Sequence, residues 1–102
     1  MFKVKAPETF KASLTIVGHG REQKLNLSYR HMTQEAYTSL LQRLAAQETT
    51  PTQAILDMVA EWDADVSLDT AGVDEALQQQ IGLDAVIITG YAQAIQVARK
   101  GN

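Results

Sequence analysis

Apolar and polar residues alternate along two stretches near the start of the chain, residues 10–17 and 24–30. A period of two is typical of strands with one buried face. Gly18 and Gly20 lie between the stretches, and glycine suits turns because it reaches positive φ without steric cost. The pattern therefore predicts an antiparallel hairpin with a loop of about five or six residues, preceded by a loose lead-in over residues 1–9. Its inward-facing side chains would be Phe10, Ala12, Leu14, Ile16, Leu25, Leu27 and Tyr29.

From about residue 34 onward, the apolar residues recur at helical spacing. Thr33 and Thr50 stand where helix N-caps belong, and the proline after the second threonine is favoured at a first helical position. We therefore expect one helix from Thr33 to near Gln47, and a second from Thr50 to Trp62 or Asp63.

The second half of the chain predicts a loop and two further helices. Residues 63–72 show no period and should form the loop. A short helix is expected from Val73 to Gln80, ended by Gly82. The last helix should run from about Asp84 to Lys100, with aliphatic residues around most of its circumference. Such a helix either lies at the centre of the core or offers part of its surface to a partner.

These elements predict an α+β fold, in which an N-terminal antiparallel β-hairpin is followed by three or four packed α-helices. The fold would be mostly helical. A length of 102 residues suits one domain, residues 1–102. The side chains expected in the core are Phe10, Leu14, Ile16, Leu25, Leu27, Leu40, Leu44, Ile55, Val59 and Ile88.

Composition removes several classes of function. The chain has no cysteine, which excludes disulfides, thiolate metal sites and thiol chemistry. No apolar run approaches the ~18–20 residues that span a bilayer, and the first residues lack the apolar core of a secretory signal. We therefore expect a soluble cytoplasmic protein with no membrane role.

Charge is divided unevenly along the chain. Residues 1–47 carry seven basic and three acidic side chains, a net +4, whereas residues 48–102 carry nine acidic and two basic ones, a net −7. One interpretation is that the acidic groups merely solvate helix ends and a loop. The other is that oppositely charged faces of two copies attract each other, which predicts a homo-oligomer. The last helix, around Tyr91 and Ile95, would then supply the apolar contact area.

Patterns for catalysis or ligand binding are weak. His19 lies in the glycine turn and His31 follows a strand, and neither adjoins a recognisable nucleophile. The acidic loop from Asp63 spaces carboxylates as an EF-hand does, but Leu68 replaces the glycine and Asp74 the glutamate that calcium coordination uses. The basic residues form no dense run. We therefore expect no catalytic residue, no cofactor, no metal and no nucleic-acid partner.

Protein binding is the class of function that these observations favour, with an enzyme of unknown type as a weaker alternative. Trp62 is either a core anchor or an interface anchor. The candidate protein-binding residues are Trp62, Asp63, Tyr91, Ile95 and Arg99.

The order of several short segments resembles the tail assembly chaperones of long-tailed bacteriophages (siphophages) and prophages. The resemblance covers most of the chain and lies in the co-occurrence of segments, none of which is specific alone. The loop over residues 65–71 is shorter and less glycine-rich than the family pattern. The segments are the hairpin ending in Leu-Ser-Tyr-Arg-His, then Val59-Ala60-Glu61-Trp62-Asp63, Gly72-Val73-Asp74-Glu75-Ala76-Leu77, Tyr91-Ala92-Gln93-Ala94 and Ala98-Arg99-Lys100-Gly101-Asn102.

The resemblance implies a non-enzymatic protein of the host bacterial cytoplasm that is absent from the mature virion. It implies binding to the tape-measure protein, whose long helical body would be kept soluble during tail assembly. It also implies self-association, and a longer frameshifted form that recruits the tail-tube protein. The alternative is a small cytoplasmic protein-binding adaptor or regulator without a phage role.

Overall fold

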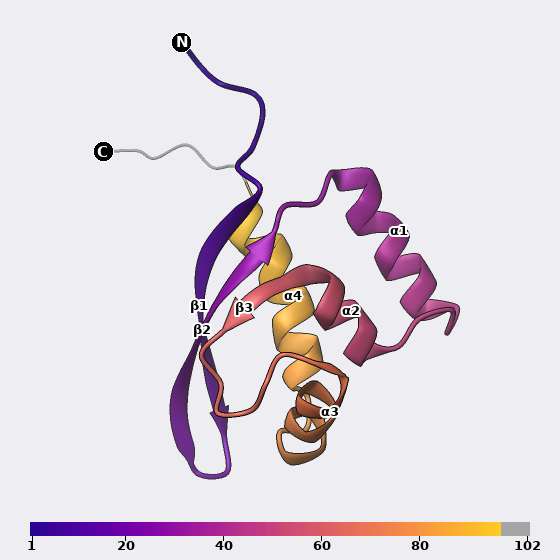
Figure 1. Ribbon diagram of the computed structural model, residues 1–102. Coiled ribbons are helices and arrows are strands. Elements are labelled where there is room, and N and C mark those ends of the chain that lie inside the picture. Colours follow the sequence, from indigo (N-terminus) through magenta and orange to yellow (C-terminus); the bar gives the residue numbers. More distant parts are fainter. Residues whose placement is uncertain (97–102) are drawn as a thin grey trace.

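The hairpin predicted from the alternation is the first element of the computed structural model, which describes residues 1–96 (Figure 1). Strands β1 (Thr9–Gly18) and β2 (Arg21–Arg30) pair along their whole length. The expected faces are confirmed, because Leu25, Leu27 and Tyr29 of β2 are buried. The inward residues of β1 are half-buried against the core, namely Phe10, Ala12, Leu14 and Ile16.

The connection between the strands is shorter than expected. It consists of only His19 and Gly20, both at positive φ (55° and 73°), as in a type I′ turn. Such turns match the twist of paired strands and fix their register. The predicted loop of about five or six residues was wrong because residues 21–23 are polar on both faces. This end of β2 extends beyond the core, so it lacks the alternation of apolar and polar residues that would identify it as a strand.

The first helices begin where their caps were predicted. In α1 (Gln34–Ala45), the Thr33 hydroxyl accepts the amide of Ala36, and in α2 (Pro51–Met58) the Thr50 hydroxyl accepts the amide of Gln53. Helix α1 ends close to the expected position in a Schellman motif, in which Gln47 adopts a φ of 60°.

The later helices differ from the prediction at their ends. Helix α3 (Thr70–Gln79) begins three residues before the expected Val73, because Asp69 caps it through the amide of Gly72. Helix α4 (Leu83–Ile95) begins as expected, but Gln96 has an extended backbone. The remainder of the range predicted up to Lys100 lies outside the described residues.

The main correction concerns the second helix, which was expected to reach Trp62 or Asp63. It ends at Met58, and the next residues form a third strand, β3 (Val59–Trp62), which pairs antiparallel with β2. A bulge lies in this pairing, because Tyr29 faces Val59 while Ser28 faces Glu61. The extra residue leaves the two inward side chains, Val59 and Trp62, three positions apart, which imitates helical spacing.

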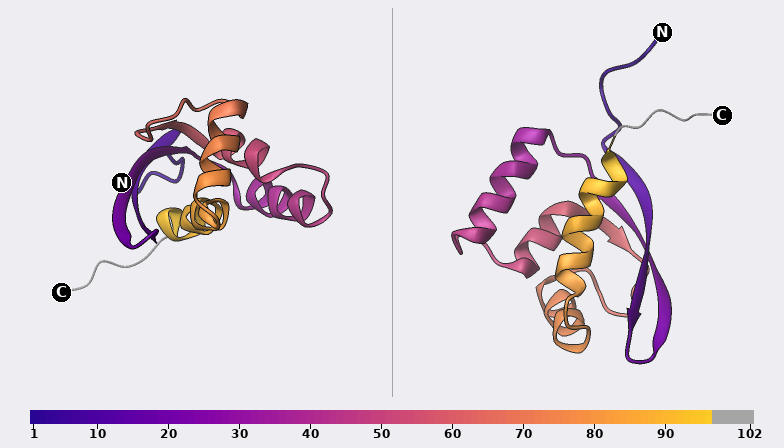
Figure 2. Two further views of the ribbon diagram at one scale, coloured as in Figure 1. Left: turned by 90° about the horizontal axis from the view of Figure 1, so that it is seen from below. Right: turned by 180° about the vertical axis from the view of Figure 1, so that it is seen from behind.

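All described helices lie on one face of the sheet, as the view from below shows (Figure 2). Helix α4 runs next to the hairpin, and α1 lies farthest from it (Figures 1 and 2). Five of the ten predicted core residues are buried, namely Leu25, Leu27, Leu40, Ile55 and Val59. The other five are half-buried against the core, namely Phe10, Leu14, Ile16, Leu44 and Ile88. The buried core also contains Tyr29, Ala54, Met58, Val73, Leu83, Ile87 and Tyr91.

Four aromatic rings join the sheet to the helices. The ring of Tyr91 in α4 lies 5.0 Å from that of Tyr29, edge to face, and 5.1 Å from that of Tyr37, stacked. Phe10 of β1 completes the cluster, with ring centroids 5.6–5.7 Å from Tyr29 and Tyr91. These separations are typical of attractive aromatic pairs.

The hydroxyls of the same cluster bond to backbone. Those of Tyr29 and Tyr37 donate to the carbonyls of Ile87 and Ile88 in α4, at 2.7 and 3.0 Å. The hydroxyl of Tyr91 accepts the amide of Met32. Since each buried oxygen has a partner, the cluster combines apolar burial with a fixed position for α4.

Two glycines allow backbone to approach other groups closely. A Cβ on Gly90 would lie 2.9 Å from a methyl carbon of Leu14 and 3.1 Å from the Tyr29 hydroxyl oxygen. A Cβ on Gly72 would lie 1.8 Å from the Ser67 carbonyl oxygen, which is backbone and cannot swing away. Helix α4 therefore reaches the sheet through Gly90, and α3 reaches its preceding loop through Gly72.

We predict that Gly72→Ala destabilises the protein by at least about 1–3 kcal/mol, the usual cost of overpacking. The same change in an open helix would instead stabilise it by roughly 1 kcal/mol. Gly18→Ala is the matched control, because a Cβ there meets nothing within 4 Å. Urea unfolding of both variants measures the difference, and equal stabilities would show that the approach of α3 to Ser67 is not tight.

A second prediction concerns alkaline pH. Burial, in the first place, raises the pKa of all three tyrosines, Tyr29, Tyr37 and Tyr91. In the unfolded chain they ionise near pH ~10. Above that pH the unfolded state loses protons that the folded state keeps, so stability must fall as pH rises. We expect tyrosinate absorbance to rise together with loss of near-UV circular dichroism. Ionisation of all three tyrosines in a folded protein would contradict this.

Candidate protein-binding cleft

A cleft opens because the hairpin is much longer than β3. Strand β3 pairs with β2 only at residues 27–29. Beyond that point the chain leaves the sheet, and the lower half of β2 stands apart from the loop over residues 63–69 and from α3 (Figure 1). The space between them has a volume of about 560 Å³, which is within the range of protein ligand sites.

The cleft combines an apolar interior with a charged rim. Its apolar lining comes from separate elements, with Leu25 from β2, Trp62 from β3 and Leu83 from α4. The rim carries Asp65 from the loop and Glu75 from α3, with Arg21 across from them on the hairpin, and all three are exposed. The lining also includes Ile16, Gln23, Lys24, Asp63, Ala64, Val66, Ala76, Gln79 and Gln80.

At the β3 end, the cleft is closed by Asp63 and Asn26. The two Asp63 carboxylate oxygens accept the Asn26 backbone amide at 2.9 Å and its side-chain amide at 2.8 Å. The Asp63 amide donates in turn to the Asn26 carbonyl at 3.0 Å. The bonds from the side chain and the backbone of Asn26 lower the pKa of Asp63. The carboxylate therefore stays ionised while this contact is formed.

Near the hairpin end of the cleft, the turn residue His19 contacts the lining residue Gln79. The Nε2 of His19 lies 2.9 Å from the carbonyl oxygen of Gln79, the last residue of α3. A carbonyl only accepts, so the imidazole Nε2–H is the donor. The hairpin tip is thus joined to the end of α3 by one exposed hydrogen bond.

The structure brings two of the five predicted binding residues to this cleft. Trp62 is half-buried, with its indole N–H donating to the Val66 carbonyl at 3.0 Å, and Asp63 follows it at the rim. Tyr91 is fully buried in the aromatic cluster and offers no surface to a partner in this conformation. Ile95 is half-buried at the last turn of α4. Arg99 lies outside the described residues.

Several cleft residues had no signal in the sequence. Glu75, Leu83 and the backbone of Gln79 belong to elements far from the hairpin in the chain, so only the tertiary fold brings them beside it. His19 could have been noticed, because a histidine in a type I′ turn places its ring at the tip of a hairpin. Its partner could not be inferred from local pattern.

The acidic loop has structural tasks of its own. The Asp69 carboxylate accepts the amide of Gly72 at 2.7 Å and the hydroxyl of Ser67 at 2.8 Å, and these bonds lower its pKa.

Within residues 1–96, histidine and carboxylate side chains nowhere gather in groups of three that could hold a metal ion. In the same part of the chain, every helix is too short or too polar to span a bilayer.

We predict that Asp63→Asn weakens the β3 end of the cleft, because an amide nitrogen cannot accept a bond from Asn26. The exchange of the Asn26 amide proton should accelerate and the melting temperature should fall. Since the pKa of Asp63 is lowered on folding, its contribution is present above pH ~3.9 and disappears as pH falls through the lower, folded value. Asp65→Asn is the control in the same loop. Unchanged exchange in Asp63→Asn would mean that the contact contributes nothing.

Comparison with known proteins gave one match. A family model described as a phage tail assembly chaperone matches residues 1–102. No curated protein and no solved structure matches the chain.

Proposed function

The chain belongs to the phage tail assembly chaperone family, and we propose that it binds the tape-measure protein and keeps it soluble during tail assembly. Membership of the family supports a chaperone role in phage tail assembly and suggests a non-enzymatic protein. The match along the whole chain is the observation that carries the proposal. It also favours this role over a small adaptor or regulator without a phage role.

The cleft is the surface that best supports such binding. Leu25 and Leu83 line its interior and are buried, whereas Trp62 is half-buried at its edge, with its only polar group already bonded to the Val66 carbonyl. A tryptophan whose N–H is satisfied can offer its ring to a partner at no cost in unpaired polar groups. Such half-buried aromatic residues are the usual anchors of protein interfaces.

The charges at the rim indicate what kind of segment fits. An amphipathic helix presents an apolar stripe flanked by charged side chains, and binds by laying the stripe in an apolar groove. Here the stripe would meet Leu25, Trp62 and Leu83, while basic flanking residues would meet Asp65 and Glu75. A long helical protein that exposes such stripes is the partner we propose. Shielding the stripes would keep that partner from aggregating.

The remaining parts of the proposal follow the same role. The protein would act in the host bacterial cytoplasm and be absent from the mature virion, because a chaperone of the tape-measure protein would have to leave before the tube covers its partner. A longer frameshifted form would bring in the tail-tube protein. A homo-oligomer would place several clefts along one extended partner.

Co-expression with the tape-measure protein tests this proposal. We expect the chain to raise the soluble fraction of its partner and to co-purify with it. Trp62→Ala should weaken binding about 30-fold or more, because an interface tryptophan contributes about 2 kcal/mol or more. A tape-measure protein that stays equally insoluble with and without the chain would overturn the proposal.

Two further variants separate binding from folding. Trp62 also packs against the core, so Trp62→Ala must be compared at a temperature where circular dichroism shows it folded. Ala64→Arg places a large charged side chain in the cleft and removes little from the core. Leu41→Ser is the matched control, because Leu41 is an exposed apolar residue on α1, away from the cleft. Equal binding by all variants would exclude the cleft as the binding surface.

A further inference from the structure

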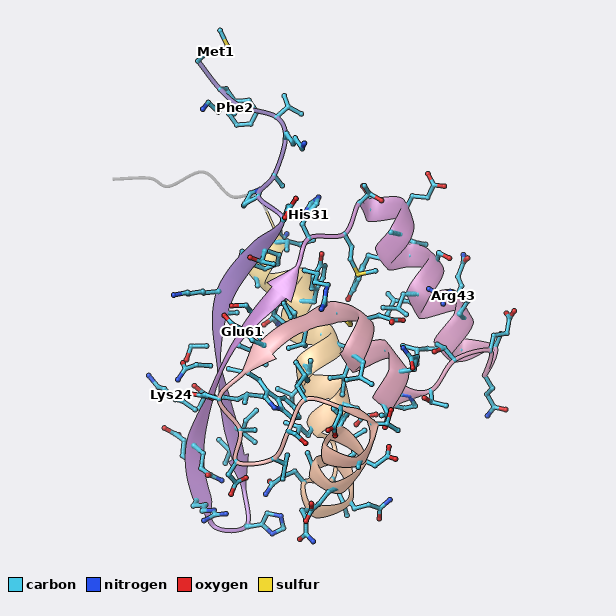
Figure 3. All side chains as sticks on the ribbon, in the orientation of Figure 1. Met1, Phe2, Lys24, His31, Arg43 and Glu61 are labelled. Carbon is cyan, nitrogen blue, oxygen red and sulfur yellow. The ribbon has the colours of Figure 1, made fainter. Side chains whose placement is uncertain are left out.

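The first residues form a segment with exposed apolar side chains, which no other part of residues 1–96 covers. Phe2 and Val4 are 85% and 88% exposed, and Lys3 and Lys5 lie between and after them. Residues 2–6 thus alternate apolar and basic, as a strand would, yet they pair with no other segment in the described part of the chain (Figure 3). We call residues 1–7 the lead segment. Exposed apolar residues in such a regular order indicate a segment that binds another protein surface.

The cleft has an unused sheet edge that can receive a strand. Both the amide and the carbonyl of Asn26 bond to Asp63, so they point toward the β3 side of β2. Backbone groups alternate sides along a strand, so those of Lys24 and Glu22 point the same way. They lie beyond the end of the β2–β3 pairing, and Lys24 lines the cleft. The side chain of Lys24 points away from the helices, on the opposite face of the sheet (Figure 3), so its backbone remains available at the strand edge.

The lead segment and the cleft complement each other chemically. An extended segment along the β2 edge would turn alternate side chains inward, so Phe2 and Val4 would meet Leu25, Trp62 and Leu83. The intervening lysines would then lie near a lining in which acidic side chains outnumber basic ones by three to two. The acidic residues are Asp63, Asp65 and Glu75, and the basic ones are Arg21 and Lys24. Backbone bonding, apolar contact and charge therefore favour the same occupant.

The lead segment is too short to fill the cleft of its own chain. It leaves the hairpin at Glu8, whose carbonyl accepts the His31 amide, at the end opposite the turn (Figure 1). From His31 to Leu25, at the near end of the cleft, is six residues, or about 20 Å along the strand at ~3.3 Å per residue. From Glu8, four fully extended residues to Val4 span about 14 Å at most, and six to Phe2 about 22 Å at most. Val4 therefore stops short of the cleft, and Phe2 reaches only its near end when the segment is fully extended.

We propose that the lead segment of one copy docks in the cleft of a second copy, alongside the lower half of its β2. Each copy then offers one lead segment and one cleft, so the contact is heterologous and builds rings or open arrays. The apolar area comes from Phe2 and Val4 rather than from Tyr91, which is buried. The proposal does not depend on the identity of the phage partner. If that partner uses the cleft as well, it and the lead segment compete for it.

Two single-ended variants test the contact in the full chain. In the lead variant, Phe2→Ser and Val4→Ser remove the apolar side chains without adding charge. In the cleft variant, Asp65→Lys and Glu75→Lys reverse the charge of the rim. Val17→Ser is the matched control, because Val17 is 75% exposed on the hairpin outside both surfaces. Circular dichroism and melting temperature confirm that each variant is folded.

Sedimentation velocity over a range of concentrations gives the outcome. The natural chain and Val17→Ser should associate, whereas each single-ended variant alone should sediment as a monomer up to concentrations at least tenfold higher. An equimolar mixture of the two variants should form dimers and nothing larger, because only one intact lead segment and one intact cleft remain per pair. A monomeric natural chain, a lead variant that associates normally, or a mixture without dimers would each overturn the proposal.

Discussion

The position of α4 depends on the aromatic cluster between the sheet and the helices. Tyr29 and Tyr37 bury their rings and donate their hydroxyls to consecutive carbonyls of α4, those of Ile87 and Ile88. Close packing alone would let the helix slide or rotate, whereas these bonds fix both its height and its rotation. Gly90 is needed for the same reason, since a side chain there would meet Leu14 and the Tyr29 hydroxyl. Because α4 is fixed, Leu83 at the first position of this helix is held in the cleft, beside the part of the hairpin near its turn.

The cleft results from a mismatch in strand length. The hairpin strands have ten residues each, and β3 has four. Sheet and helices therefore pack tightly around the aromatic cluster and separate toward the turn. The bulge opposite Ser28 and Tyr29 contributes, because it keeps both Val59 and Trp62 on the inner face before the chain turns away at Asp63. The same short strand thus completes the core and leaves part of β2 unpaired.

Much of this fold could be predicted from local pattern, and the failures have physical reasons. The faces of the hairpin and the threonine caps were predictable because alternation and capping depend on near neighbours. Strand β3 was not, because a bulge gives a strand the spacing of a helix and α2 leads directly into it. Trp62 and Asp63 were placed among the candidate residues from sequence, but their association with Glu75 and Leu83 depends on long-range packing. Tyr91, like Trp62, stands among apolar residues in the sequence, and only its contacts in the structure show that it belongs to the core.

The two ends of the cleft are held by exposed hydrogen bonds, whereas its interior is formed by buried apolar side chains. One of these bonds runs from His19 to Gln79, and a set of them lies between Asn26 and Asp63. Exposed bonds of this kind exchange readily with water, whereas Leu25 and Leu83 are buried in the core. The hairpin tip can therefore move away from α3 while the core remains intact. In the binding role proposed above, such an adjustable mouth would accept segments that differ in bulk and sequence, which a rigid pocket would distinguish.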